Sequence, residues 1–80
     1  MFYAYILKSD KDGKYYYGST DNLDARVERH NKGYVRSTKY RRPLVLCYFE
    51  KFETREEAYR RELYFKSIDG YVWLKSNNII

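Results

Sequence analysis

Apolar positions along the chain gather in three short runs that polar and charged stretches separate. The first run, residues 2–8, is rich in strand-forming side chains and ends at a polar segment with the turn signal Asp12-Gly13. The aromatic run over residues 14–18 then predicts a returning antiparallel strand. The third run, Leu44–Phe52 after Pro43, predicts another strand, whose length and apolar content suit a central position or a well-covered face.

Helical signals mark two further stretches. The segment 22–32 has Asp21 as a candidate N-cap and Gly33 as a candidate C-cap. The capping box Thr54-Arg-Glu-Glu57 stands at the start of the segment 55–67. In such a box, the side chains of Thr54 and Glu57 each accept a hydrogen bond from the backbone N–H of the other residue. We therefore expect one helix between the second and third strands and another after the third strand.

The last part of the chain predicts little regular structure. Residues 68–70 include Gly70 and should break the second helix, and Tyr71–Lys75 adds one more helical turn. Residues 77–80 should be either loose or lightly packed. The expected fold is an α/β domain of residues 1–80, with a small three-stranded antiparallel sheet flanked by helices in the order β-β-α-β-α. A chain of 80 residues has a thin core.

The inward face of the first predicted helix carries polar groups. At about 100° per residue, Leu23, Arg26, Val27 and His30 share one arc. An inward cation and imidazole are unusual on a purely structural helix. Taken alone, His30 also fits a hydrogen-bonded core histidine, so the wheel leaves both interpretations open.

The second predicted helix places Glu62 and Lys66 in the middle of its apolar arc. Their neighbours there are Ala58, Tyr59, Leu63 and Phe65. An inward carboxylate costs several kcal/mol unless it is paired or binds a metal. Glu62 therefore has either a structural ion pair with Arg26 or Lys66, or a functional role.

Basic residues exceed acidic ones, 16 to 11, so the net charge is +5 and anionic partners are favoured. Nucleic acid suits this charge better than a membrane surface. The basic segment 34–42 adds to this, since cations interleaved with tyrosines suit a surface that tracks phosphates and stacks bases. An ordinary solvated loop is the alternative. In the segment 34–42, the candidate nucleic-acid contacts are Arg36, Lys39, Arg41 and Arg42, interleaved with Tyr34 and Tyr40.

The single cysteine, Cys47, cannot form an internal disulfide and lies in an apolar run, so we expect a buried, inert thiol. No spacing of residues typical of a zinc site occurs. No run approaches the length of a membrane span, and no signal-peptide pattern opens the sequence. We expect a cytoplasmic protein without membrane contact.

An ordered set of residues resembles the GIY-YIG nuclease superfamily, and most closely its small stand-alone bacterial branch, related to the amino-terminal nuclease domain of an excision-repair protein. The resemblance covers residues 2–68. Three positions depart from it, since Tyr3 and Ala4 replace the glycine and the middle residue of the first motif, and Tyr17 is the middle residue of the second. The matching residues are Tyr5-Ile-Leu-Lys8, Tyr16-Tyr-Gly-Ser-Thr20, Asn22-Leu23, Arg26, His30-Asn31, Ala58, Glu62 and Lys66.

The resemblance implies hydrolysis of phosphodiester bonds with one divalent cation, Mg²⁺ or Mn²⁺. It makes Glu62 the metal ligand, which suits Mg²⁺ because that ion keeps several waters. It implies that Tyr5 and Tyr16 meet across the hairpin and that Tyr5 helps to deprotonate the attacking water. A tyrosine with an ordinary pKa of about 10 needs nearby cations for this task, and Lys8 is the matching candidate.

Three more roles follow from the resemblance. Arg26 would hold the scissile phosphate and offset charge in the transition state. His30 would shuttle a proton or orient a tyrosine hydroxyl. Gly18, also a candidate nucleic-acid contact, would let the chain approach the site closely.

The expected activity is metal-dependent endonuclease cleavage of DNA, and structure-specific cleavage in repair or recombination would suit it. A catalytically weak nucleic-acid-binding module and a structural domain with an internal Arg–Glu pair are the alternatives. No separate DNA-reading domain is visible in 80 residues. Specificity then comes either from a protein partner or from recognition of a DNA shape.

Overall fold

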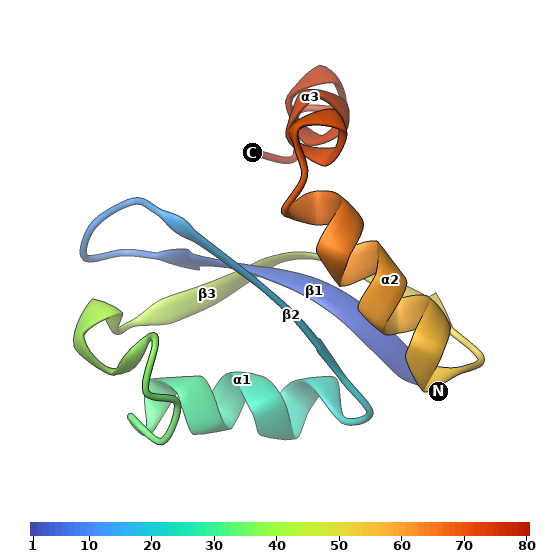
Figure 1. Ribbon diagram of the computed structural model, residues 1–80. Coiled ribbons are helices and arrows are strands. Elements are labelled where there is room, and N and C mark those ends of the chain that lie inside the picture. The colour runs from blue at the N-terminus through green and yellow to red at the C-terminus, as the bar shows by residue number, and fades with distance from the viewer.

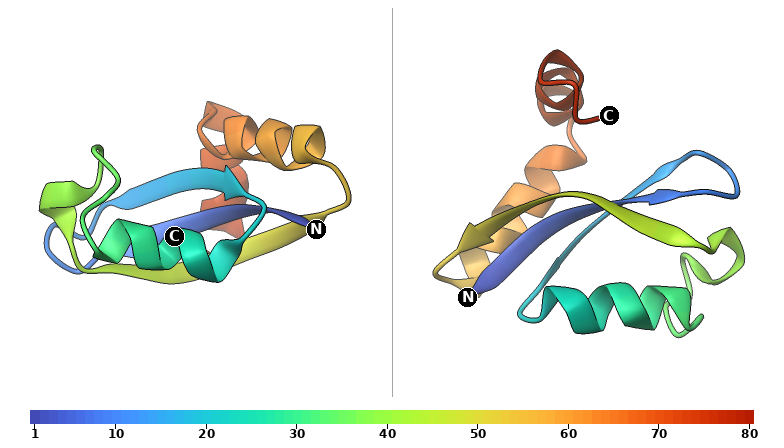
Figure 2. Two further views of the ribbon diagram at one scale, coloured as in Figure 1. Left: turned by 90° about the horizontal axis from the view of Figure 1, so that it is seen from below. Right: turned by 180° about the vertical axis from the view of Figure 1, so that it is seen from behind.

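The computed structural model describes residues 1–80 and shows a three-stranded antiparallel sheet with helices on both of its faces (Figure 1). The predicted α/β fold is confirmed. Helix α1 covers one face, and α2 with α3 covers the other, as the two further views also show (Figure 2). The elements are β1 (Phe2–Ser9), β2 (Tyr15–Thr20), α1 (Leu23–Asn31), the 3-10 turn η1 (Lys39–Arg41), β3 (Leu44–Phe52), α2 (Arg55–Phe65) and α3 (Ile68–Ser76).

Strand β1 is the centre of the sheet, because β2 and β3 both pair with it in antiparallel register. Of the two alternatives left open for Leu44–Phe52, a central position or a well-covered face, the central position is wrong. That strand is an edge, and residues such as Val45 and Phe49 are exposed along it. The pairing of β1 with β3 shifts by one residue between Ile6 and Leu7, which leaves Cys47 in a bulge.

The bulge also corrects the expectation for the cysteine. Cys47 is exposed, although its Sγ donates a hydrogen bond to the backbone oxygen of Ile6 at 3.4 Å. An edge strand has a neighbouring strand on one side only, so the residues of an apolar run there are not all buried. Partial burial raises the pKa of the Cys47 thiol, which keeps it protonated and unreactive at neutral pH.

Alternate residues of β1 belong to different clusters. Ala4 and Ile6 pack with Phe65 of α2 and Leu74 of α3. Tyr5 and Leu7 point to the opposite face and pack with Leu44 and with the apolar side of α1. One strand thus serves two separate layers, because successive side chains point to opposite faces of a sheet.

Helix α1 begins one residue later than predicted. Asn22, not Asp21, is the N-cap, and its side chain accepts a hydrogen bond from the backbone N–H of Ala25 at 3.1 Å. Gly33 closes the helix as predicted, with a φ of 82° that favours glycine. The N–H groups of Gly33 and Tyr34 donate to the last free carbonyls of α1, which stops the helix directly after its final turn.

The capping box of Thr54 and Glu57 is confirmed at the start of α2. The end of the chain is more ordered than predicted. Helix α3 runs over nine residues, and Ser67 caps it by accepting from the N–H of Gly70. Ile79 and Ile80 pack against the cluster under α2 and α3, so residues 77–80 are not loose. No helix has the length and apolarity that a bilayer-spanning segment needs.

Candidate active site

The site is built around a hydrogen bond between Tyr5 of β1 and His30 of α1. Tyr5 Oη lies 3.0 Å from Nε2 of His30, and neither side chain is exposed. His30 points inward because it lies one turn after Val27 on the apolar side of α1. The predicted inward imidazole is therefore present, and its partner is a predicted site residue.

Thr38 completes this hydrogen-bond chain. Its Oγ1 lies 2.7 Å from Nδ1 of His30, and the side chain is fully buried. The Thr38 hydroxyl itself points to the backbone oxygen of Val35 at 3.5 Å. When the Thr38 hydroxyl donates to Val35, it accepts from the Nδ1–H of His30, and Nε2 is then the acceptor for Tyr5. Sequence reasoning missed Thr38, because no periodicity links a loop residue to a helix eight positions earlier.

The second motif tyrosine, Tyr16 of β2, lies over the same cluster. Its ring centroid is 4.9 Å from that of His30 and 6.4 Å from that of Tyr5. Gly18 lies directly opposite Tyr5 in the sheet. A Cβ at Gly18 would lie 2.4 Å from Oη of Tyr5, so this glycine makes room for the tyrosine ring. The expected close approach of the chain to the site at Gly18 is present, and the group it approaches is the buried Tyr5 ring.

Arg26 supplies the positive charge of the site. It is half-buried one turn before His30 and forms no salt bridge. Its charge favours the ionised form of Tyr5 and disfavours a second positive charge on His30. A cation without an acidic partner beside a tyrosine hydroxyl suits a ligand that brings its own negative charge.

Burial controls the protonation of the central pair. It raises the pKa of Tyr5 well above the ordinary value, with a further contribution from Tyr16, while Arg26 opposes the rise and Glu62 adds to it. Burial, and then Arg26, lower the pKa of His30 to about 4. Both groups are therefore neutral at neutral pH, which is the state in which one donates and the other accepts.

Glu62 reaches the site from α2. Its carboxylate is 13% exposed and pairs with Lys66, whose Nζ lies 2.7 Å from Oε2. The structural pairing is therefore with Lys66 and not with Arg26. The hydrogen bond that Lys66 donates to Glu62 raises the pKa of Lys66, with a smaller effect from Tyr16. Since Glu62 also acts on Tyr5, the structure brings both carboxylate and ammonium to the tyrosine pair.

The chemistry of the donor set fits one hard cation. Oε1 of Glu62 makes no hydrogen bond, and no cluster of three or more His, Cys, Asp or Glu side chains occurs in the chain. A single carboxylate oxygen is what Mg²⁺ requires when waters and phosphate oxygens complete its coordination. The same residues do not fit a zinc site, which needs several nitrogen or sulfur ligands.

Lys8 is not part of this cluster, and its assignment as the cation beside Tyr5 is wrong. Three residues along a strand reverse the face, so Lys8 lies on the side of Ile6. Its Nζ lies 5.7 Å from the ring centroid of Tyr15, its cross-strand partner. The alternation of β1 was the signal that excludes this residue.

Arg41 is also engaged elsewhere. Its Nε lies 3.0 Å from Oδ2 of Asp12, and its guanidinium donates to the backbone oxygen of Tyr15. It therefore joins the basic loop to the β1–β2 turn, contrary to the expectation of a free phosphate contact. The other three basic candidates, Arg36, Lys39 and Arg42, are exposed and form no salt bridge.

This fold and this cluster define a GIY-YIG catalytic domain. The chain belongs to that nuclease family, whose catalytic-domain model matches residues 1–70. Its relatives include a UPF0213 protein of Clostridium perfringens, 46% identical over 69 residues, with 85% of this chain and 73% of that protein covered. A UPF0213 protein of Staphylococcus haemolyticus is 45% identical over 74 residues, with 91% and 89% covered.

The structural comparison agrees with this membership. A solution NMR structure of a UPF0213 protein from Bacillus halodurans matches with a TM-score of 0.55 and 35% sequence identity. The match covers 95% of this chain and 84% of the other. The predicted kinship with the small stand-alone branch is confirmed, although the names of these relatives state no activity.

Proposed function

We propose that this chain is a metal-dependent endonuclease that hydrolyses DNA phosphodiester bonds at branched or interrupted structures, in repair or recombination. The observation that carries the proposal is the buried hydrogen bond from Tyr5 to His30, with the charges of Arg26 and Glu62 acting on the same hydroxyl. Each of these groups is costly to bury, so their convergence favours chemistry over a purely structural core.

In the proposed reaction, Tyr5 takes a proton from the attacking water as its own proton passes to Nε2 of His30. The water oxygen forms a bond to phosphorus, the bond from phosphorus to the leaving sugar oxygen breaks, and that oxygen takes a proton from solvent. The lowered pKa of His30, about 4, keeps its Nε2 lone pair free at neutral pH but also makes it a weak base, so the transfer relies on Arg26 to stabilise negative charge on Tyr5.

The remaining groups bind and orient. Arg26, which has no acidic partner, would hold the scissile phosphate and offset its growing charge. Glu62 would hold Mg²⁺ or Mn²⁺ through its free Oε1, and such a cation would supply positive charge to offset the phosphate oxygens. Lys66 stays paired with Oε2 of Glu62 and so fixes the orientation of the carboxylate.

Cleavage of a panel of nicked, flapped and branched DNAs with Mg²⁺ or Mn²⁺ tests this proposal. Glu62→Gln should reduce cleavage by at least about 100-fold, the scale of a lost catalytic group, and leave DNA binding near that of the wild type. Glu56→Gln, on the exposed first turn of the same helix, is the matched control and should cleave normally. Wild-type protein that cleaves none of the DNAs would contradict the assignment.

One observation favours a second candidate, a nucleic-acid-binding module without catalysis. Lys66 occupies Oε2 of Glu62, which is the contact that a structural ion pair makes. Lys66 is half exposed, so loss of the pair costs about 1 kcal/mol at most. On this alternative, Glu62→Gln lowers the melting temperature and weakens binding, and Mg²⁺ changes neither protein. Melts of both proteins with and without Mg²⁺ separate the two functions.

A further inference from the structure

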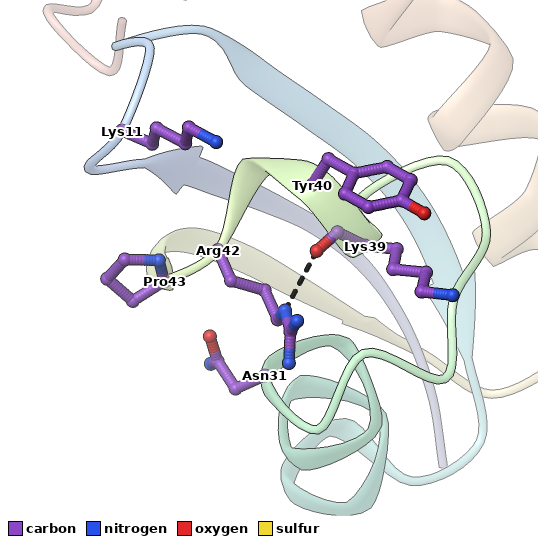
Figure 3. A pocket seen from close by; sticks show the side chains of 6 residues that line it. All are labelled: Lys11, Asn31, Lys39, Tyr40, Arg42 and Pro43. Atoms are coloured by element: carbon purple, nitrogen blue, oxygen red, sulfur yellow. Dashed lines mark hydrogen bonds between the residues drawn. The ribbon is translucent and has the colours of Figure 1, made fainter.

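An open pocket of about 460 Å³ lies between the β1–β2 turn, the end of α1 and the loop before β3 (Figure 3). Figure 3 shows the Arg42 side chain extended toward Asn31, with its dashed bond to the backbone oxygen of Lys39. The pocket is lined by Lys11, Asn31, Lys39, Tyr40, Arg42 and Pro43.

Three of the lining side chains are cations without an acidic partner. Lys11, Lys39 and Arg42 form no salt bridge, and the nearby carboxylate of Asp12 is already paired with Arg41. Arg42 is fixed by the 2.8 Å bond from its Nε to the Lys39 carbonyl. Its terminal nitrogens stay free to bind. Three such charges around one concave surface attract an anion, and a phosphate group matches them.

The aromatic side chain of the pocket points to a nucleotide and not to a phosphate alone. Tyr40 is 75% exposed, and the Nζ of Lys39 lies 5.4 Å from its ring centroid. An exposed ring among cations is the combination that binds single-stranded nucleic acid, because each base stacks on the ring and each phosphate meets a charge. Bases inside a duplex are stacked on one another and offer no free face.

The helix end and the loop that line the pocket also carry two residues of the buried hydrogen-bond chain. Asn31 directly follows His30, and Lys39 directly follows Thr38. We propose that this pocket binds an unpaired nucleotide of a DNA strand that leaves the duplex next to the scissile bond, with its base on Tyr40. The inference rests on the proposed function and specifies which DNA structures the enzyme prefers.

Fluorescence anisotropy without divalent metal tests the pocket by binding alone. The probes are a labelled duplex with a single-stranded overhang of about ten nucleotides, within the range such grooves cover, and the matched blunt duplex. Wild-type protein should bind the overhang duplex more tightly. Tyr40→Ala should weaken that binding by about fivefold to 150-fold, the loss expected for one stacked base. Its affinity for the blunt duplex should stay within about twofold of the wild-type value.

Matched variants separate the pocket from the general charge of the surface. Tyr40→Phe keeps the ring and should bind like the wild type. Tyr71→Ala removes another exposed tyrosine beside a lysine, on α3 and outside the pocket, and should have no effect. Lys11→Ala should lower the salt slope for the overhang duplex by about 0.7, the value for one contact to a single strand. Lys14→Ala, in the same turn but outside the pocket, should not.

The pocket proposal would be overturned if wild-type protein bound the two probes equally, or if Tyr40→Ala lost the same affinity for both. Either result in a protein that cleaves DNA leaves the nuclease proposal standing. Overhang binding that depends on Tyr40, in a protein that cleaves nothing, supports the pocket and overturns the nuclease instead. These results therefore distinguish a failure of the pocket proposal from a failure of the nuclease proposal.

Discussion

His30 has a hydrogen-bond partner on each ring nitrogen, so its tautomer depends on Thr38. We predict that Thr38→Val leaves the buried Nδ1–H without an acceptor and lowers the free energy of unfolding by about 1–3 kcal/mol. DNA cleavage should also slow, because the free tautomer no longer directs Nε2 toward Tyr5. Urea titration and single-turnover kinetics measure the two effects.

Thr38→Ser is the control for that prediction, since it keeps the hydroxyl. Serine should restore most of the cleavage rate even though it loses a buried methyl group. A valine variant that cleaves as fast as serine would show that the Thr38 bond has no part in positioning His30.

The depressed pKa of His30 predicts how stability depends on pH. The unfolded chain binds a proton at His30 below about pH 6.5, whereas the folded chain does so only near pH 4. Stability is therefore complete above this window and falls as the pH drops through it. We expect a loss of about 2 kcal/mol between about pH 7 and about pH 5. Denaturant unfolding at both pH values measures it, and His30→Gln should lose this part of the slope.

Among single residues, those on regular helices were predicted best. The wheel alone gave Arg26, His30 and Glu62 their inward positions, because a helix repeats at a fixed angle. Lys8 was misplaced because its likeness to a motif was weighed above the alternation of a strand. Thr38 could not be predicted, since the path of the loop that carries it depends on tertiary contacts such as those of Arg41.

At the scale of elements, β2 packs closely on β1 because Gly18 of β2 has no side chain where the Tyr5 ring of β1 lies. We predict that Gly18→Ala pushes the Tyr5 ring out of its place, because the new Cβ would lie 2.4 Å from Cζ and Oη of Tyr5. Cleavage should fall by at least about tenfold, and the protein should lose about 1–3 kcal/mol of stability from overpacking. Single-turnover cleavage and thermal melts measure the two losses.

Ser19→Ala, the next position of β2, faces away from Tyr5 and is the control for Gly18→Ala. It should change neither measurement by more than a small amount. A Gly18→Ala protein with the stability and activity of wild type would show that the Tyr5 ring is free to move.

Helix ends were predictable because their signals are local. The capping box at Thr54 and the stop at Gly33 act within a few residues of the backbone groups that they satisfy. The position of β3 at the edge was not predictable in this way. Strand order depends on which strands meet across long loops, and an apolar run such as Leu44–Phe52 fits either a centre or an edge.

For the whole molecule, the net charge of +5 predicts DNA binding that weakens as salt rises. We expect Arg36→Ala, which removes an exposed and unpaired cation, to reduce the slope of log K against log salt by about 0.9 on duplex DNA. Arg41→Ala should leave the slope nearly unchanged and lower stability by about 1 kcal/mol, since it loses hydrogen bonds to Asp12 and Tyr15. Titrations at several salt concentrations measure the slope. Equal slopes for both variants would contradict the separate roles.

The alternation along β1 sets how this molecule can change over evolution or in the laboratory. Odd positions such as Tyr5 face the chemistry, and even positions such as Ile6 face the cluster under α2 and α3. Substitutions that improve packing in the cluster under α2 and α3 can raise the melting temperature without touching a reacting group. The usual conflict between robustness and activity is therefore relaxed in this strand. A single-residue insertion within β1 has the opposite effect, because it exchanges the two layers at once.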